Sequence, residues 1–108
     1  MKKAHPVDRL FKTISSRKKA DPSKSYTARL LKKGVAQCAK KLGEESVETA
    51  LAAVTKNKRA VKAESADLLY HLLVVLHARN ITLAEVEAEL GARTRQSGLD
   101  EKASRKSG

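Results

Sequence analysis

Apolar residues recur at helical spacing along most of this chain, and no stretch shows the alternation of apolar and polar residues that a half-buried strand requires. This spacing predicts helices at about residues 6–19, 27–33, 35–55, 58–79 and 82–93. The sequence therefore predicts an all-α fold, an antiparallel helical bundle of four to five helices.

Polar and glycine residues at the expected helix ends support these boundaries. Ser25 and Asn57 are suited to cap the helices that follow them, because their side-chain oxygens can accept a bond from a free backbone N–H. Gly34 ends or kinks the second helix. Thr82 and Glu85 form the capping-box pattern of the last helix.

Two segments are apolar enough to supply most of the core. The run 68–76 is apolar almost all round, as is typical of a helix buried at the centre of a bundle. A chain of 108 residues buries only a modest core, so we expect dimerisation to complete the bundle by covering further apolar surface. The apolar face predicted for 35–55 runs through Val35, Cys38, Ala39, Val47, Ala50, Leu51 and Val54.

The length fits one domain. We expect residues 1–97 to form the helical domain. Residues 98–108 are polar and basic without periodicity, so we expect them to be a disordered basic tail.

The net charge of +11 favours polyanionic partners in general, but the acidic residues concentrate in the middle of the chain. With one Phe, two Tyr and no Trp, a surface that stacks on bases is hard to build. An acidic centre would also repel phosphate in the absence of a cation. Nucleic acid is therefore disfavoured as a partner.

Cys38 is the only cysteine, which rules out an intrachain disulfide and fits a reducing cytosol. The N-terminus becomes charged at once and has no long apolar stretch of the kind found in signal peptides. The apolar run 68–76 is too short to span a bilayer. We therefore expect a cytoplasmic location and no membrane partner.

Five carboxylates stand in two short clusters on the two longest expected helices. Glu44, Glu45 and Glu48 form the first cluster, and Glu64 and Asp67 form the second. Acids three or four residues apart lie on the same face of a helix, where their charges repel one another. A divalent cation would compensate that repulsion.

The spacing of the clusters places them opposite each other. Glu48 lies about two turns before the expected turn near residues 56–57, and Glu64 lies about two turns after it. Carboxylate oxygens without Cys or several His residues favour hard cations, so we expect Mg²⁺, with Mn²⁺ as an alternative. Four lysines stand nearby in sequence as candidates for phosphate binding: Lys32, Lys33, Lys40 and Lys41.

Simpler interpretations exist for each of these residues. Taken singly, the carboxylates are typical of a solvated helix face. Glu64 and Asp67 would also stabilise the N-terminal half of their helix by interacting with its dipole. The joint pattern favours a site, because Asp67 abuts the apolar run 68–76. His71 is either a partner or proton carrier for Asp67 or a buried structural histidine. Two further residues either contact a ligand or simply begin a helix: Tyr26 and Thr27.

Three motifs in order identify a family. The segments Glu45-Ser46-Val47-Glu48 and Glu64-Ser65-Ala66-Asp67 match the E-x-x-E and E-x-x-D marks of the all-α nucleoside triphosphate pyrophosphohydrolase superfamily. Over about residues 7–95 the chain resembles the phosphoribosyl-ATP pyrophosphohydrolase family within it. The narrower marks of that family are Ser25-Tyr26-Thr27-Ala28, Lys41-Leu42-Gly43-Glu44-Glu45 and Ala66-Asp67-Leu68-Leu69-Tyr70-His71-Leu72-Leu73-Val74.

The resemblance implies hydrolysis of 1-(5-phosphoribosyl)-ATP to 1-(5-phosphoribosyl)-AMP and pyrophosphate in histidine biosynthesis. It also implies Mg²⁺, a homodimer and a cytoplasmic location. Carried over by motif, four carboxylates hold the metal and Glu44 is an extra ligand or orients the attacking water. The choice of general base among them stays open. The four metal ligands would be Glu45, Glu48, Glu64 and Asp67.

Two other hypotheses compete with this function. One is a housecleaning pyrophosphatase that acts on a non-canonical nucleoside triphosphate. The other is a non-enzymatic helical module that binds nucleic acid through its basic ends, and it predicts steeply salt-dependent binding.

Overall fold

The computed structural model describes residues 5–94, which hold five α-helices, one 3₁₀ turn and no strand. This confirms the all-α prediction, while the expected boundary at residue 97 and the basic tail lie outside the described range. No helix in residues 5–94 is long and apolar enough to cross a membrane. In chain order the elements are α1 (Pro6–Ser16), η1 (Arg17–Lys19), α2 (Tyr26–Lys33), α3 (Val35–Thr55), α4 (Lys58–Ala78) and α5 (Leu83–Arg93).

The predicted helix caps are confirmed. Each accepts a hydrogen bond from the backbone N–H three residues further on: Ser25 at 3.1 Å, Asn57 at 3.0 Å and Thr82 at 3.1 Å. Gly34 separates α2 from α3 with φ of 97°, a backbone conformation that side chains with a Cβ rarely adopt. The first helix is shorter than predicted, because its last turn tightens into η1.

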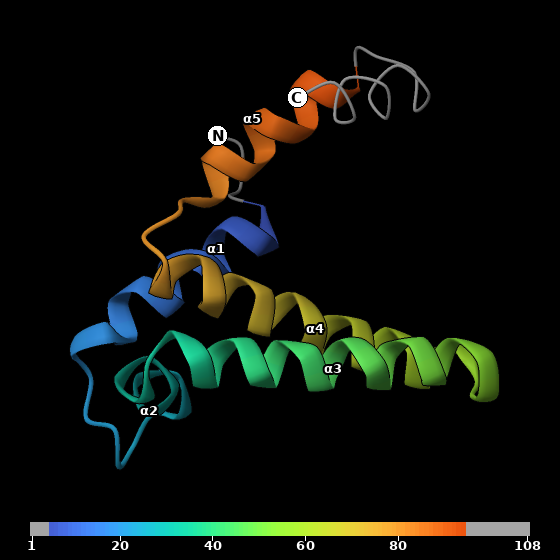
Figure 1. Cartoon of the computed structure of the whole chain (residues 1–108), viewed down its shortest axis with the longest axis horizontal. Helices are drawn as coiled ribbons and strands as arrows, with labels where there is room; N and C mark the ends of the chain where they lie inside the picture. The colour runs from blue at the N-terminus through green and yellow to red at the C-terminus, as the bar shows by residue number, and fades with distance from the viewer. Residues whose placement is uncertain (1–4, 95–108) are drawn as a thin grey trace.

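Helices α3 and α4 form the body of the molecule. They lie side by side and antiparallel along its longest axis (Figure 1). Each has 21 residues, which corresponds to a length of about 30 Å. The hydroxyl of Thr49 in α3 shares its one proton between two backbone carbonyls, that of Glu45 in the same helix at 2.8 Å and that of Glu64 in α4 at 3.1 Å. The bond to Glu64 fixes which turn of one helix lies opposite which turn of the other.

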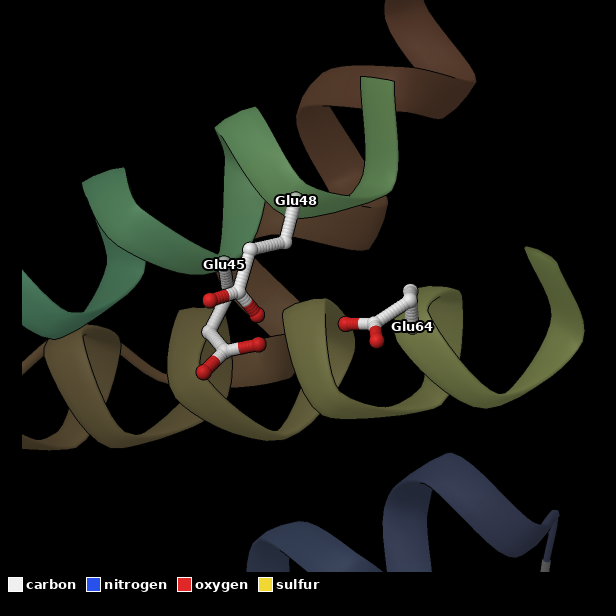
Figure 2. A group of neighbouring side chains, drawn as sticks. All are labelled: Glu45, Glu48 and Glu64. Carbon is white, nitrogen blue, oxygen red and sulfur yellow. The ribbon is translucent and has the colours of Figure 1, made fainter. Parts of the chain in front are cut away.

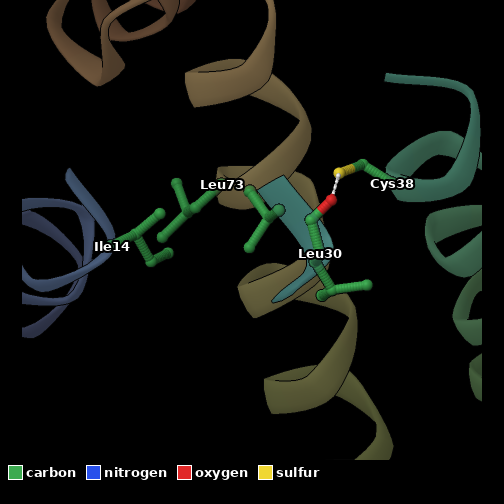
Figure 3. Packing of buried hydrophobic residues seen from close by; sticks show 5 residues of the cluster. Ile14, Leu30, Cys38 and Leu73 are labelled. Carbon is green, nitrogen blue, oxygen red and sulfur yellow. Dashed lines mark hydrogen bonds between the residues drawn. The ribbon is translucent and has the colours of Figure 1, made fainter. Parts of the chain in front are cut away.

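The core lies at one end of this helix pair, where α1 and α2 pack against it (Figure 3). The Cys38 thiol donates to the carbonyl of Leu30 at 3.3 Å and belongs to this core. Burial raises the pKa of that thiol, so Cys38 serves as a small packing residue. The buried residues of this core cluster are Ile14, Leu30, Cys38, Leu73 and Val74.

Most of the apolar face predicted for residues 35–55 is not buried within one chain, so the prediction is mostly wrong for the core of a single copy. Val47, Leu51 and Val54 are 59%, 58% and 84% exposed. They form one stripe at i, i+4, i+7 along α3. Helical periodicity grouped the stripe correctly, but it carries no information about what covers the stripe. Of the seven residues predicted for that face, only Cys38 is buried; Val35, Ala39, Val47, Ala50, Leu51 and Val54 are exposed.

The apolar run in α4 is also only partly buried. Leu73 and Val74 lie in the core, whereas Leu69 and Leu72 are exposed. The prediction of burial all round this helix is therefore wrong, because the other helices cover only some of its faces. Helix α5 projects away from the helix pair and contains no buried residue, although Leu83 in its first turn packs against the core (Figure 1).

Candidate metal centre between the two long helices

Three carboxylates from α3 and α4 converge on one point. Glu45 and Glu48 come from α3, and Glu64 reaches toward them from α4 (Figure 2). One oxygen from each side chain can be chosen so that all three oxygens lie within 4.8 Å of one another. The structure therefore brings together three of the five acids predicted to form the site.

Local helix geometry explains this convergence. Glu45 and Glu48 are three residues apart, so both side chains leave the same face of α3. Thr49 adjoins Glu48 and bonds to the carbonyl of Glu64, which holds that turn of α4 opposite the acids of α3. Thr49 was not predicted from the sequence, because a single threonine within a helix gives no signal of a contact between helices.

Glu45 and Glu64 are partly buried, whereas Glu48 is exposed. The Glu45 side chain is only 12% exposed. Burial raises the pKa of its carboxyl, and the neighbouring charges of Glu48 and Asp67 raise it further. Oxygen Oε2 of Glu64 is buried and has no hydrogen-bond partner among the described residues. A buried carboxylate oxygen without a partner is costly, and a cation held by this group could supply that partner.

The donor set fits a hard divalent cation. Three carboxylate oxygens that lie within 4.8 Å of one another could all reach one hard divalent cation. All three donors are carboxylates. Mg²⁺ and Mn²⁺ prefer such oxygen donors, whereas softer metals prefer sulfur donors.

The other two predicted acids lie outside this group of three. Asp67 is exposed, although it is near enough to contribute to the raised pKa of the Glu45 carboxyl. Glu44 is also exposed and accepts a hydrogen bond from the ammonium of Lys41 at 3.2 Å. That bond raises the pKa of Lys41.

A hollow opens beside the carboxylates on the side of the turn between α3 and α4. Its volume is about 350 Å³, and Glu48 and Glu64 line it together with Leu51, Ala52 and Lys56. Lys56 brings a cation to this hollow, and the sequence did not single it out. Its position eight residues after Glu48, about two helical turns, was the available signal.

The four lysines predicted to bind phosphate do not line this hollow. Lys41 is tied to Glu44 at the opposite end of the acidic group, and the other three are exposed on α2 and α3. The structure gives these three no bond to the carboxylates: Lys32, Lys33 and Lys40.

His71 connects the acidic group to the remaining predicted residues. It is buried, and its Nε2 lies 3.9 Å from Oε1 of Glu45, which is longer than a hydrogen bond. Burial lowers the pKa of the imidazole, with a smaller contribution from Lys41, and favours the neutral ring. Thr27 is buried and hydrogen-bonded to Tyr70, whereas the exposed Tyr26 ring meets His71 edge-on.

Known proteins resemble this chain over almost its whole described length. The family model described as phosphoribosyl-ATP pyrophosphohydrolase matches residues 7–94. The chain is 60% identical to the phosphoribosyl-ATP pyrophosphatase of Azorhizobium caulinodans over 96 residues, which cover 89% of this chain and 88% of the relative. Identity is 57% to the phosphoribosyl-ATP pyrophosphatase of Parvibaculum lavamentivorans, with 94% of each chain covered. It is 59% to phosphoribosyl-ATP pyrophosphatase 1 of Bradyrhizobium diazoefficiens, covering 90% of this chain and 92% of the relative. The chain belongs to the phosphoribosyl-ATP pyrophosphohydrolase family.

Proposed function

We propose that this chain hydrolyses 1-(5-phosphoribosyl)-ATP between its α and β phosphates, yielding 1-(5-phosphoribosyl)-AMP and pyrophosphate in histidine biosynthesis. Family membership over nearly the whole described range supports the reaction. The observation that carries the proposal is the convergence of Glu45, Glu48 and Glu64 within 4.8 Å. A triphosphate needs its negative charge neutralised before water can attack it, and these acids are suited to hold the neutralising cation.

The proposed cofactor is Mg²⁺, which Mn²⁺ can replace. When bound, such an ion polarises the phosphoryl group and lowers the pKa of a coordinated water. Glu45, Glu48 and Glu64 hold it from two helices whose relative position is fixed by Thr49. Asp67 adds negative charge beside them and is the fourth proposed ligand.

Two residues next to the proposed ligands are candidates for orienting a carboxylate or the attacking water. The neutral His71 ring beside Glu45 can carry one proton on either nitrogen, and its Nδ1 has no hydrogen-bond partner among the described residues. It is suited to orient the Glu45 carboxylate. Glu44 is exposed at the edge of the group and remains our candidate for an additional ligand or for orienting the attacking water.

The substrate phosphates are proposed to contact lysines at both ends of the acidic group. Lys41 is held at one end by Glu44, and Lys56 lines the hollow at the other end. An ammonium group at each end can neutralise charge on the phosphates as the pyrophosphate leaves. Three exposed lysines complete the proposed phosphate-binding set: Lys32, Lys33 and Lys40.

We also propose that two copies of the chain form a homodimer in the cytoplasm. The stripe of Val47, Leu51 and Val54 on α3 and the pair Leu69 and Leu72 on α4 leave large apolar side chains in water. Contiguous apolar surface of this kind marks an interface in most proteins. Leu51 also lines the hollow with two of the carboxylates, so the second copy would lie beside the site.

A pyrophosphate-release assay with phosphoribosyl-ATP tests the reaction directly. We expect turnover with Mg²⁺ and none after chelation, and weaker turnover of dUTP and ATP under the same conditions. A preference for dUTP or another triphosphate would indicate a housecleaning pyrophosphatase instead. Salt-dependent binding of nucleic acid without any pyrophosphate release would indicate the non-enzymatic module.

A further inference from the structure

Tyr26 is an aromatic side chain placed where a bound ligand can reach it. The chain has only one Phe and two Tyr, and its other tyrosine, Tyr70, is half-buried. Tyr26 is the first residue of α2 and is 46% exposed. The exposed part of this ring offers a flat apolar surface on which a bound ligand can stack.

Other side chains fix the orientation of this ring. It packs against the ring of Tyr70 at a centroid distance of 6.4 Å and an interplanar angle of 25°. It also meets His71 edge-on at 6.1 Å. Tyr70 is in turn held by a hydrogen bond to the buried Thr27. Tyr26 is therefore an aromatic surface oriented in advance, with little side-chain freedom to lose when a ligand binds.

This aromatic surface lies one side chain away from the carboxylates. His71 contacts Tyr26 on one side, and on another its Nε2 is 3.9 Å from Oε1 of Glu45. The Lys41 ammonium lies near both Tyr26 and Glu45 as well. A triphosphate whose phosphates lie at the carboxylates therefore has its nucleoside within reach of Tyr26.

The substrate of the proposed function has an unusual base. In phosphoribosyl-ATP a ribose is attached to N1 of the adenine, and substitution at N1 makes the ring an amidinium that is positively charged near neutral pH. A flat cation over an aromatic face gains a cation–π attraction that neutral adenine lacks. The difference between phosphoribosyl-ATP and ATP is thus one that an aromatic ring can detect.

We propose that Tyr26 is a specificity-determining residue that stacks on the cationic, N1-substituted adenine of the substrate and so discriminates against ATP. This inference depends on the proposed function, because it names how the same site recognises its substrate. The attraction requires the aromatic ring but not its hydroxyl. It also requires the positive charge on the base, so it disappears at a pH where the base is neutral.

The test uses 1-methyl-AMP and AMP as competitive inhibitors of phosphoribosyl-ATP hydrolysis by the full-length protein. We expect the wild type to bind 1-methyl-AMP about 5- to 30-fold more tightly than AMP. Tyr26→Leu should lose this preference and raise KM with little change in kcat, whereas Tyr26→Phe should retain both properties of the wild type. Raising the pH until 1-methyl-AMP loses its charge should abolish the preference in the wild type.

Two results would overturn the inference. One is a wild-type protein that binds the two nucleotides equally at neutral pH, a measurement that requires no variant to fold. The other is a Tyr26→Leu protein with native helicity and an unchanged preference. Absence of phosphoribosyl-ATP hydrolysis by the wild type is a separate result, which would refute the proposed function itself.

Discussion

The two ends of the α3–α4 pair differ in what covers them. At one end α1 and α2 supply Ile14 and Leu30, and the side chains around Leu73 are almost fully buried. At the other end, toward the turn between the helices, Leu51 and Val54 face water. The carboxylates lie between these regions. One chain thus buries a core at one end and leaves Leu51 and Val54 in water at the other, and the second end borders the proposed site.

The largest expected effect is on catalysis. Glu48→Gln and Glu64→Gln each remove one charged donor from the group within 4.8 Å while keeping the side-chain size. We expect kcat/KM to fall by about 100-fold or more with unchanged helicity. Pyrophosphate release and circular dichroism measure the two properties. Glu87→Gln on α5, outside this group, should have normal activity.

A loss of helicity in either variant would mean that the carboxylates stabilise the fold. Wild-type turnover in both variants would contradict their assignment to the site.

The next largest effect is on the stability of the end that α1 and α2 cover. Leu73→Ala removes side-chain atoms from a site that is 1% exposed, and we expect it to lower the free energy of unfolding by about 2–5 kcal/mol. The matched change at the open end, Leu51→Ala, should cost about 0.5 kcal/mol or less in protein dilute enough to be monomeric. Urea denaturation compares the two variants. Equal losses would refute the contrast between the ends.

The open end should govern association between copies. Leu51→Glu places a charge within the exposed stripe of α3, and burying that charge in an interface is unfavourable. We expect sedimentation to show a dimer for the wild type and a monomer for this variant. Leu90→Glu makes the same change at an exposed leucine of α5, outside the stripe of α3, and serves as the control. A dimer that persists in Leu51→Glu would place the interface elsewhere.

The smallest effect is on stability without metal. Burial and neighbouring charges raise the pKa of the Glu45 carboxyl, so ionised Glu45 destabilises the metal-free fold. Glu45→Gln should therefore raise stability at neutral pH, which a higher thermal midpoint would show.

The sign of the pH dependence follows from the same raised pKa. Between the ordinary pKa of a glutamate, about 4.3, and the raised value, the folded chain binds more protons than the unfolded one. The wild type therefore gains stability as pH falls through that window, and the advantage of Glu45→Gln shrinks. Thermal unfolding in a chelator at a series of pH values measures this, and an advantage that grows toward acid pH would contradict it.

Local signals in the sequence predicted most of the fold. Apolar spacing located the helices, and the side chains of Ser25 and Asn57 located two helix starts. Periodicity could not predict that Val54 would face water, because it states which residues share a face and not which face is covered. The exposure of the stripe depends on how many helices one chain has available to cover it.

The convergence of the acids was predicted from the sequence, but the neighbouring residues of the candidate site were not. The spacing of Glu45, Glu48 and Glu64 around one turn indicated that they would converge. The positions of Thr49 and Lys56 depend on the register and tilt between two helices, which no local pattern encodes. Roles for all of these residues in catalysis stay predictions.

Binding of a divalent ion tests the central claim most directly. Titration of the full-length protein with Mn²⁺, followed by the electron paramagnetic resonance of the free ion, reports binding without any need for turnover. We predict that the wild type removes Mn²⁺ from solution, that Mg²⁺ competes for the same site, and that combined replacement of Glu45, Glu48 and Glu64 by Gln abolishes the binding. Equal Mn²⁺ binding by the wild type and the triple variant would contradict the account.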